Sequence, residues 1–218
     1  MRVVCLSDTH LRHAAFQIPE GDLLVVAGDV TGRGSLAELD QVDAWLATLP
    51  HPHKVLIAGN HDFGFELDPP AARARIRHAT YLQDEEVTLG GLRIWGSPWQ
   101  PVFFDWAFNL PRGAPLREKW DAIPVGIDVL VTHGPPRGIL DRTARGEDVG
   151  DDDLLAAVLR VRPRLHVFGH IHEARGAVQR HGISFVNACG CDLHYRPTQP
   201  PIVVDLPVLP DRDPPEAP

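Results

Sequence analysis

The fold is decided by the stretch Val55-Leu56-Ile57-Ala58-Gly59-Asn60-His61-Asp62. Its first four residues are apolar and the Gly-Asn pair that follows is a turn signal, so the stretch predicts a buried strand that stops abruptly. Such a turn would hold Asn60 and His61 at the carboxyl edge of a sheet, where open α/β sheets place their chemistry. A polar turn with a solvated histidine would have the same local sequence, so the function of this turn depends on the rest of the chain.

Four other apolar runs end in the same way. Residues 2–6, 23–27, 127–132 and 165–168 each predict a strand, and each is followed within two residues by an aspartate or a histidine. Continuous apolar strands are typical of sheets that are covered on both faces, as in α/β folds. Between residues 27 and 55, Ser35 and Glu38 match a helix capping box and Pro50 ends the helical pattern. This order predicts a strand–helix–strand crossover between parallel strands.

The rest of the chain predicts shorter elements. A helix is expected over residues 68–78, a hairpin over 81–96 with its turn at Gly90-Gly91, and further strands near 184–187 and 201–205. The acidic run 150–153 is interpreted as the N-cap and first turn of a helix. Residues 97–120, rich in Trp and Pro, predict a long loop that is either functional or packed by its own aromatic side chains. One domain over residues 1–206 is expected, followed by a Pro-rich tail, residues 207–218, that is predicted to be disordered.

Charge and cysteine usage limit the partners and the compartment. The 218 residues include 21 basic and 29 acidic side chains, for a formal charge of -8, which argues against binding to duplex nucleic acid. The apolar run at the N-terminus is too short for a signal peptide, and no stretch is long enough to span a membrane. Cys5 lies in a predicted strand, and Cys189 and Cys191 are separated by one residue, a poor spacing for a mutual disulfide or a zinc knuckle. We expect three reduced thiols in a cytoplasmic protein, with no metal or redox role for Cys189 and Cys191.

The residues at the five strand ends share one property, because all of them carry side chains that bind metal cations. They are Asp8, His10, Asp29, Asn60, His133, His170 and His172. Each alone suits an ordinary turn, but the carboxyl ends of strands in an α/β sheet converge, so the five turns are expected to meet in space.

The donor types indicate which metals would bind. Carboxylates, imidazoles and one amide without a thiolate suit manganese, iron or zinc in a reactive site rather than a structural zinc cage. The number of donors is sufficient for two divalent ions that share a carboxylate. Two such ions can activate a bridging water and clamp a phosphoryl group, so metal-assisted phosphoester hydrolysis is the predicted chemistry.

The motifs also resemble a known family. The order and spacing of five segments are similar to the five-part motif of the calcineurin-like metallophosphoesterase superfamily: Asp8-Thr9-His10, Gly28-Asp29, Gly59-Asn60-His61-Asp62, Thr132-His133-Gly134 and Gly169-His170-Ile171-His172. Residues 95–99, 104–112, 133–136 and 197–201 more narrowly resemble the small metallophosphoesterase-domain proteins of animal brain and their bacterial relatives. Some animal members have glycine in place of the first histidine of the last motif, whereas this chain has His170.

The resemblance implies a fold and a role for each strand-end residue. The expected fold is a four-layer α/β/β/α sandwich with two mixed sheets and a dinuclear metal site at the carboxyl ends of the strands. One metal would be bound by Asp8, His10 and His172, the other by Asn60, His133 and His170, with Asp29 bridging the two. His61 would face the phosphate without binding metal.

The leading functional hypothesis is a phosphodiesterase acting on a small phosphoester or a nucleotide, cyclic nucleotides included. A hydroxide that bridges the two metals would attack phosphorus in line, and His61 would protonate the leaving alkoxide. Asp62 is expected either to orient the His61 ring or to cap the turn. The alternatives are a phosphomonoesterase or an exonuclease with the same metal site, or a non-catalytic module that binds nucleotide or serves as a scaffold.

The substrate pocket is predicted from the aromatic loop. Trp99, Trp106 or Phe108 are candidates to stack on a base, and Arg12, Asn109 and Arg112 are candidates to contact phosphate or sugar. The alternative for the loop residues is packing within the loop itself.

Overall fold

The first β-sheet contains the strand before the quoted turn. The computed structural model describes residues 1–208, and this sheet has the order β13 (Ile202–Asp205), β1 (Arg2–Leu6), β2 (Leu23–Ala27), β3 (His53–Ile57) and β4 (Thr80–Tyr81). The strands β1 to β4 run parallel, and β13 pairs antiparallel with β1. The turns that follow β1, β2 and β3 therefore lie at one edge of the sheet.

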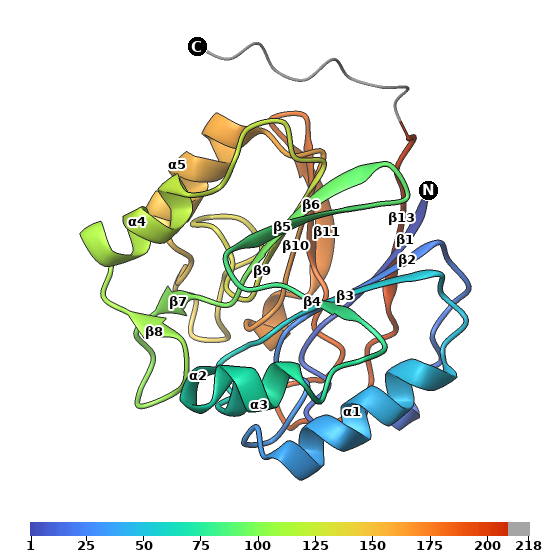
Figure 1. The fold of residues 1–218 in the computed structure, drawn as a ribbon. Coiled ribbons are helices and arrows are strands. Elements are labelled where there is room, and N and C mark those ends of the chain that lie inside the picture. The colour runs from blue at the N-terminus through green and yellow to red at the C-terminus, as the bar shows by residue number, and fades with distance from the viewer. Residues whose placement is uncertain (209–218) are drawn as a thin grey trace.

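The second sheet supplies the other two turns of the predicted site. Its order is β11 (Gly176–Arg180), β12 (Ile183–Asn187), β10 (Leu165–Phe168), β9 (Val129–Thr132), β6 (Leu92–Ser97) and β5 (Glu85–Leu89). The four central strands are parallel, and both edge strands are antiparallel to their neighbours. The sheets face each other, with their parallel strands ending near the same side of the molecule (Figure 1).

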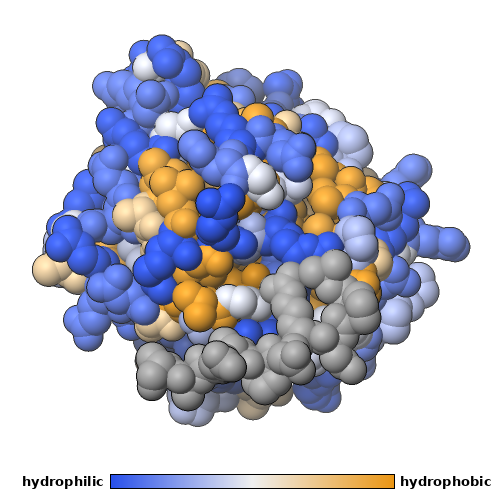
Figure 2. Space-filling model, turned by 90° about the horizontal axis from the view of Figure 1, so that it is seen from above, coloured by the Kyte–Doolittle hydropathy of each residue, from blue (hydrophilic) through white to orange (hydrophobic). Residues whose placement is uncertain are grey.

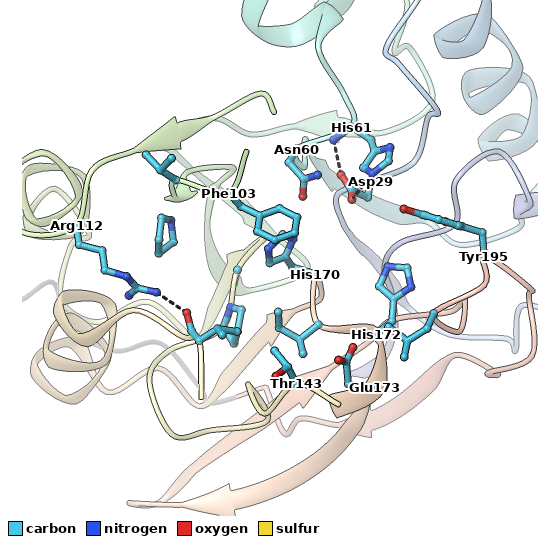
Figure 3. A pocket seen from close by; sticks show the side chains of 17 residues that line it. Asp29, Asn60, His61, Phe103, Arg112, Thr143, His170, His172, Glu173 and Tyr195 are labelled. Carbon is cyan, nitrogen blue, oxygen red and sulfur yellow. Dashed lines mark hydrogen bonds and ion pairs between the residues drawn. The ribbon is translucent and has the colours of Figure 1, made fainter. Parts of the chain in front are cut away.

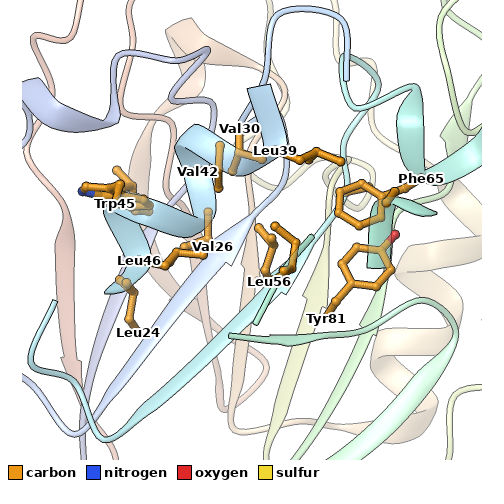
Figure 4. Close-up of a cluster of buried hydrophobic side chains, with 14 of the residues drawn as sticks. Leu24, Val26, Val30, Leu39, Val42, Trp45, Leu46, Leu56, Phe65 and Tyr81 are labelled. Carbon is orange, nitrogen blue, oxygen red and sulfur yellow. The ribbon is translucent and has the colours of Figure 1, made fainter. Parts of the chain in front are cut away.

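Three buried apolar clusters define four layers. One cluster joins the inner faces of the two sheets and includes Val25 of β2 and Val131 of β9. A second lies between the outer face of the first sheet and helix α1 (Leu36–Thr48), and Figure 4 shows Leu39, Val42 and Leu46 of this helix against the strands. The third lies between the outer face of the second sheet and helices α4 (Ala114–Asp121) and α5 (Asp152–Val161). The predicted four-layer sandwich of two mixed sheets is confirmed.

Several local predictions are confirmed in detail. Ser35 and Glu38 form the reciprocal bonds of a capping box at the start of α1. The carboxylate of Asp151 accepts a hydrogen bond from the backbone N–H of Leu154, so the acidic run does cap α5. Gly90 and Gly91 connect β5 to β6 as the hairpin turn.

Two predictions of local structure are wrong. The helix expected over residues 68–78 is much shorter, because only α3 (Pro69–Arg73) lies in this range. The N–H groups of Arg77 and His78 donate to the buried carboxylate of Asp43 instead of continuing the helix. A separate single turn, α2 (Gly64–Leu67), precedes α3. The long loop expected over residues 97–120 contains two short paired strands, β7 (Gln100–Pro101) and β8 (Asn109–Leu110), and helix α4. Pro115 lies in the first turn of α4, where proline is tolerated because that N–H has no helical partner. The strands β4 and β11 were not predicted.

The limits of the domain and its surface are the last features of the fold. Strand β13 ends at Asp205, while residues 209–218, most of the predicted tail, lie outside the described residues. Among residues 1–208, no helix combines the length and the apolar character needed to cross a bilayer. Figure 2 shows a face on which hydrophilic side chains surround separate hydrophobic areas.

Candidate active site

Four of the seven predicted metal ligands have a left-handed backbone. Their φ angles are 54° for Asp8, 42° for His10, 51° for Asp29 and 67° for His170. Residues with a side chain rarely adopt this conformation, and it persists where the surrounding structure over-determines it, often at functional sites. Here the backbone N–H of Asp8 donates to the carbonyl of Gly28, and that of His10 to the carbonyl of Asp29. The turns after β1 and β2 therefore hold each other in place.

Gly59 is required by space rather than by a left-handed conformation. A Cβ atom at this position would overlap both the carboxylate and the backbone of Asp29 and would approach the ring of His133. Gly169 is similar, because its Cβ would overlap the carboxylate of Asp8. The glycines of these two motifs let the donor side chains of neighbouring turns come together.

The first group of donors meets around Asp8. Nε2 of His10 lies 3.3 Å from Nε2 of His172, and Nε2 of His172 lies 3.2 Å from Oδ1 of Asp8. Nε2 of His10 is 3.9 Å from Oδ1 of Asp8 and 3.9 Å from Oδ2 of Asp29. These are the three residues predicted for one metal, together with the predicted bridging carboxylate.

The second group meets on the other side of Asp29. Nε2 of His133 lies 3.5 Å from Oδ2 of Asp29 and 2.9 Å from Oδ1 of Asn60. The ring of His170 is 5.0 Å from that of His133. Asp29 therefore borders both groups, with His133 and Asn60 close to it and His170 beside His133.

Backbone carbonyls set the direction of three imidazole rings. Nδ1 of His133 bonds to the carbonyl of Ala27 (2.9 Å), Nδ1 of His172 to that of Asp192 (2.9 Å), and Nδ1 of His61 to that of Gly32 (3.1 Å). A carbonyl can only accept, so Nδ1 carries the proton and Nε2 is directed at the centre. Outer partners of this kind fix the tautomer and the orientation of metal-binding histidines.

The donor set fits divalent cations. Two imidazole Nε2 atoms and a carboxylate oxygen that face each other within 3.9 Å would repel through their lone pairs unless protons or a cation lay between them. Among the described residues, three sets of donor atoms lie within 4.8 Å of one another: Asp8, His172 and Cys189; His10, Asp29 and His61; and Asp8, Asp29 and His133. Two of these sets include a residue that was not predicted as a ligand, Cys189 or His61. Mixed nitrogen and oxygen donors at such spacing suit manganese, iron or zinc.

The buried carboxylates of Asp8 and Asp29 and the histidines around them shift one another's pKa values. Burial disfavours the charged ring of His133, but the charge and hydrogen bond of Asp29, together with Asp8 and the carbonyl of Ala27, raise the pKa of His133 to about 9. Burial opposes charge at His172 also, yet its hydrogen bond with Asp8 raises the pKa to about 9. Burial lowers the pKa of His10 to about 4 and that of His170 to about 3. Despite burial, the imidazoles hold the pKa values of Asp8 and Asp29 below the usual range, so both carboxylates are charged.

His61 lies beside the centre and faces it. Its Nε2 is 4.0 Å from Oδ2 of Asp29, and its backbone N–H donates to Oδ1 of the same carboxylate (2.7 Å). The indole of Trp106 stacks on the imidazole with ring centroids 4.2 Å apart and an interplanar angle of 27°. The ring is therefore held by a backbone carbonyl at one edge and an aromatic face, and its Nε2 is free to meet a group at the centre.

The role of Asp62 in orienting the His61 ring is not supported, because the carbonyl of Gly32 bonds the ring instead. The buried carboxylate of Asp62 accepts hydrogen bonds from the N–H groups of Val30, Thr31 and Gly59 and from the hydroxyl of Thr31. Burial, and then the charge of Asp29, raises the pKa of Asp62 to about 6. Asp62 caps the turn, which was the second expectation for it.

A cavity of about 390 Å³ opens onto the centre (Figure 3). Its lining includes Asp29, Asn60, His61, His170 and His172 from the predicted site. Of the residues predicted to contact substrate, Arg112 lines the cavity, and its terminal nitrogens donate to the carbonyls of Val149 (2.6 Å) and Gly150 (2.7 Å). Its guanidinium thus holds the wall of the cavity together.

The other predicted substrate contacts lie outside this lining. Arg12 is exposed on the turn after β1. The indole N–H of Trp99 donates to Asp84 (2.8 Å), and Lys119 lies over its ring, 4.4 Å from the centroid. Phe108 is fully buried in the cluster beneath α1. Trp99 and Phe108 pack with the buried cluster here, and a role of Arg12, Trp99 or Phe108 in substrate binding stays a prediction.

Trp106 and Asn109 also have structural partners in place of a base or a sugar. The guanidinium of Arg33 lies 4.7 Å from the centroid of the Trp106 ring, and His61 lies at 4.2 Å. Both groups lie against the indole, which therefore packs on His61 and Arg33. The amide of Asn109 bonds to the backbone of Phe103 and Phe104 and shapes their turn.

Several residues of the site were not predicted from the sequence. Phe103, Thr143, Glu173, Leu193 and Tyr195 line the cavity, and the hydroxyl of Tyr195 points toward Asp29 and His61 in Figure 3. The aromatic richness of residues 97–120 was a signal for Phe103, whereas the other four residues lie outside that segment.

Cys189 is a further neighbour of the centre, since its thiol donates to Oδ2 of Asp8 (3.1 Å). Burial, with the adjacent charge of Asp8, holds the pKa of this thiol well above its usual value, so Cys189 remains a protonated donor. All three cysteines are free thiols, as expected.

Comparisons with known proteins show which family and fold the chain resembles. The family model described as "Calcineurin-like phosphoesterase" matches residues 1–174. Metallophosphoesterase domain-containing protein 1 of Homo sapiens is 45% identical over 231 aligned residues, which cover 94% of this chain and 71% of the relative. The UPF0046 protein C25E10.12 of Caenorhabditis elegans is 38% identical, covering 97% of this chain and 83% of its own. The crystal structure of phosphopantetheinyl hydrolase from Mycobacterium tuberculosis superposes with a TM-score of 0.63 at 18% identity, covering 99% of this chain and 98% of that one.

Proposed function

This chain belongs to the calcineurin-like phosphoesterase family and is a metal-dependent phosphoesterase, and from that premise we propose that it hydrolyses phosphodiesters, with two divalent ions bound. Asp8, His10 and His172 would hold one ion and Asn60, His133 and His170 the other, with Asp29 shared between them. Manganese, iron or zinc would each suit these donors. Ions bound there would activate water at neutral pH and offset the negative charge of the phosphoryl group.

The observation that carries the proposal is the placement of His61. Its Nδ1 is bonded to the carbonyl of Gly32, its ring is backed by Trp106, and its Nε2 faces Asp29 at 4.0 Å. An imidazole fixed in this way can hold a proton at Nε2 and donate it to the oxygen that leaves phosphorus. General acids of this kind typically contribute about 10² to 10⁴ in rate.

The cavity favours a diester over a monoester. A phosphate diester carries one negative charge and a monoester close to two, so a monoester site gains from additional cations. In the described part of the lining the one Lys or Arg side chain is Arg112, and both of its terminal nitrogens already bond to backbone carbonyls. We therefore rank phosphodiesterase above phosphomonoesterase, and a small diester, cyclic nucleotides included, above duplex nucleic acid.

We also propose that the protein is located in the cytoplasm. The three cysteines are buried free thiols, which suits the reducing cytoplasm.

His61→Ala tests the proton donor. After removal of metal and reloading with Mn²⁺, the variant should keep the wild-type metal content. It should lose about 10² to 10⁴ in kcat on a diester with an alkyl leaving group, and far less on bis(4-nitrophenyl) phosphate, whose leaving group needs no proton. His53→Ala, at the far end of β3, is the matched control. Loss of metal in His61→Ala, or equal losses on both substrates, would show that His61 is not the donor.

The alternatives separate in two further assays. Comparing bis(4-nitrophenyl) phosphate with 4-nitrophenyl phosphate keeps the leaving group constant, and a higher kcat/KM on the monoester would favour the phosphomonoesterase. A panel of cyclic nucleotides, nucleoside monophosphates and short oligonucleotides distinguishes the small diester from an exonuclease substrate. Absence of hydrolysis with Mn²⁺, Fe²⁺ and Zn²⁺ would favour a binding or scaffold module.

A further inference from the structure

The mouth of the cavity exposes an unusual share of apolar side chains. In residues 1–208, ten large hydrophobic side chains are exposed, and four of them line this cavity: Val102 (59%), Phe103 (48%), Leu193 (52%) and Tyr195 (45%). Scattered exposed hydrophobic residues are normal, but a group of them around one opening marks a binding surface. This group lies beside the predicted metal ligands, so the same ligand can contact both.

Phe103 is the residue that the local structure presents to the cavity. Its ring centroid lies 5.6 Å from that of His170 with an interplanar angle of 89°. Figure 3 shows the ring next to His170, with Arg112 on one side and Tyr195 on the other. The exposed ring of Phe103 therefore lies directly beside one of the predicted metal ligands.

The turn that carries Phe103 is built to hold it there. The side-chain amide of Asn109 donates to the carbonyls of Phe104 (2.8 Å) and Phe103 (3.3 Å), and its oxygen accepts from the N–H of Phe103 (3.3 Å). Phe104 has a left-handed backbone, with φ 49°. A strained turn, clamped by an amide, that exposes two aromatic rings costs stability and is typical of a functional loop.

The charge of the lining limits what can bind against Phe103. Both terminal nitrogens of Arg112 are engaged by backbone carbonyls, one of them also lies 3.4 Å from a carboxylate oxygen of Asp151, and the carboxylate of Glu173 faces the cavity. Away from the metal-ligand cluster, a second phosphate or carboxylate on the ligand would therefore meet the carboxylate of Glu173 and, in the described lining, a single guanidinium whose charge is already paired with Asp151. An uncharged group fits this environment.

We propose that Phe103 is the platform of a substrate subsite that takes a planar, uncharged ring carried by the phosphoester. The ring, an aryl group or a nucleobase, packs on Phe103 between the walls formed by Val102 and Leu193, while the phosphoryl group lies at the metal-ligand cluster. This subsite rests on the proposed function in one respect, that the cluster binds the phosphoryl group. It makes Phe103 a specificity residue and Asn109 its positioning residue.

The test measures equilibrium binding and needs no turnover. Phenylphosphonate and methylphosphonate are titrated calorimetrically into protein loaded with Mn²⁺. Aromatic contacts predict that phenylphosphonate binds about tenfold more tightly than methylphosphonate. Phe103→Ala should bring the ratio close to one without weakening methylphosphonate, Phe103→Tyr should preserve it, and Asn109→Ala should reduce it. The control is Phe104→Ala, because Phe104 lies on the same turn but outside the cavity lining.

The failures are distinguishable. Equal binding of both phosphonates by the wild type, or an unchanged ratio in Phe103→Ala, overturns the subsite and leaves the phosphoryl site intact. Binding of neither compound overturns the proposed function and the subsite together. A 4-carboxyphenylphosphonate that binds more tightly than phenylphosphonate would overturn the requirement for an uncharged ring.

Discussion

Asp62, which caps the turn Gly59–Asp62, is the residue whose replacement we expect to cost the most stability. Replacing Asp62 with alanine removes the acceptor for three backbone N–H groups, those of Gly59 (2.8 Å), Thr31 (2.9 Å) and Val30 (3.3 Å), and for the hydroxyl of Thr31. All of these donors are buried. A buried donor left without a partner costs about 1–3 kcal/mol.

The loss can be compared with the total stability. Water entering the vacated space will satisfy some of the donors, so the expected decrease in the free energy of unfolding for Asp62→Ala is about 3–6 kcal/mol. A domain of this kind has a total of about 5–15 kcal/mol. Asp62→Asn should lose less stability than Asp62→Ala, because its side-chain carbonyl can still accept from Thr31. It should be less stable than the wild type, because its NH₂ group cannot accept from the N–H groups of Gly59 and Val30.

The assay is urea unfolding of the metal-free protein, followed by tryptophan fluorescence. Asp68→Ala is the matched control, since the exposed Asp68 caps α3 through a single bond to Ala71 and should cost about 1 kcal/mol. If Asp62→Ala is no less stable than Asp68→Ala, the capping role is refuted. If it keeps its stability but loses turnover, Asp62 acts on the His61 ring after all. Should Asp62→Ala fail to fold, Asp62→Asn still has to fall between the wild type and complete loss.

Two further predictions concern the histidines. In the metal-free protein, His133 and His172 each have a pKa of about 9, whereas an unfolded histidine has a pKa of about 6.5. Their protonated forms therefore stabilise the fold fully below about pH 6.5, and this stabilisation is lost as the pH rises toward about 9. The melting temperature measured by calorimetry should therefore fall across this window and change less with Mn²⁺ bound; a flat profile without metal would contradict the assignment. Trp106→Ala frees one face of the His61 ring and should lower kcat on diesters with alkyl leaving groups about 10-fold to 10²-fold, with unchanged metal content, while Trp106→Phe keeps most of the rate. An equal loss on bis(4-nitrophenyl) phosphate would show that the indole acts on something other than proton donation.

The sequence was sufficient for features that depend on local signals. Apolar runs with a turn pair at their end predicted β1, β2, β3, β9 and β10, and the pair Ser35 and Glu38 predicted the start of α1. Donor residues at the ends of these strands converge because parallel strands of the two packed sheets end on the same side. Residue type and topology together were enough to bring the predicted ligands into one place.

The remaining features depend on contacts that the sequence does not display. Trp99, Trp106 and Phe108 are the same kind of residue within one segment, yet the first bonds to Asp84, the second stacks on His61 and the third is buried. Asp62 follows His61 in the chain, but its carboxylate turns to Thr31 and Gly59. Tyr195 reaches the site from a loop with no motif. Such roles follow from which element packs against which, and they become visible only in the folded structure.

The central claim is that phosphodiester hydrolysis requires two bound ions. One would be held by Asp8, His10 and His172, and the other by Asn60, His133 and His170. The most direct measurement is a titration of the metal-free protein with Mn²⁺ in which bound metal and hydrolysis of bis(4-nitrophenyl) phosphate are followed together. Activity should stay low up to one equivalent and rise to its maximum at two, with an exchange-coupled manganese pair visible by electron paramagnetic resonance. Full activity at one equivalent, or two bound ions without hydrolysis, would contradict it.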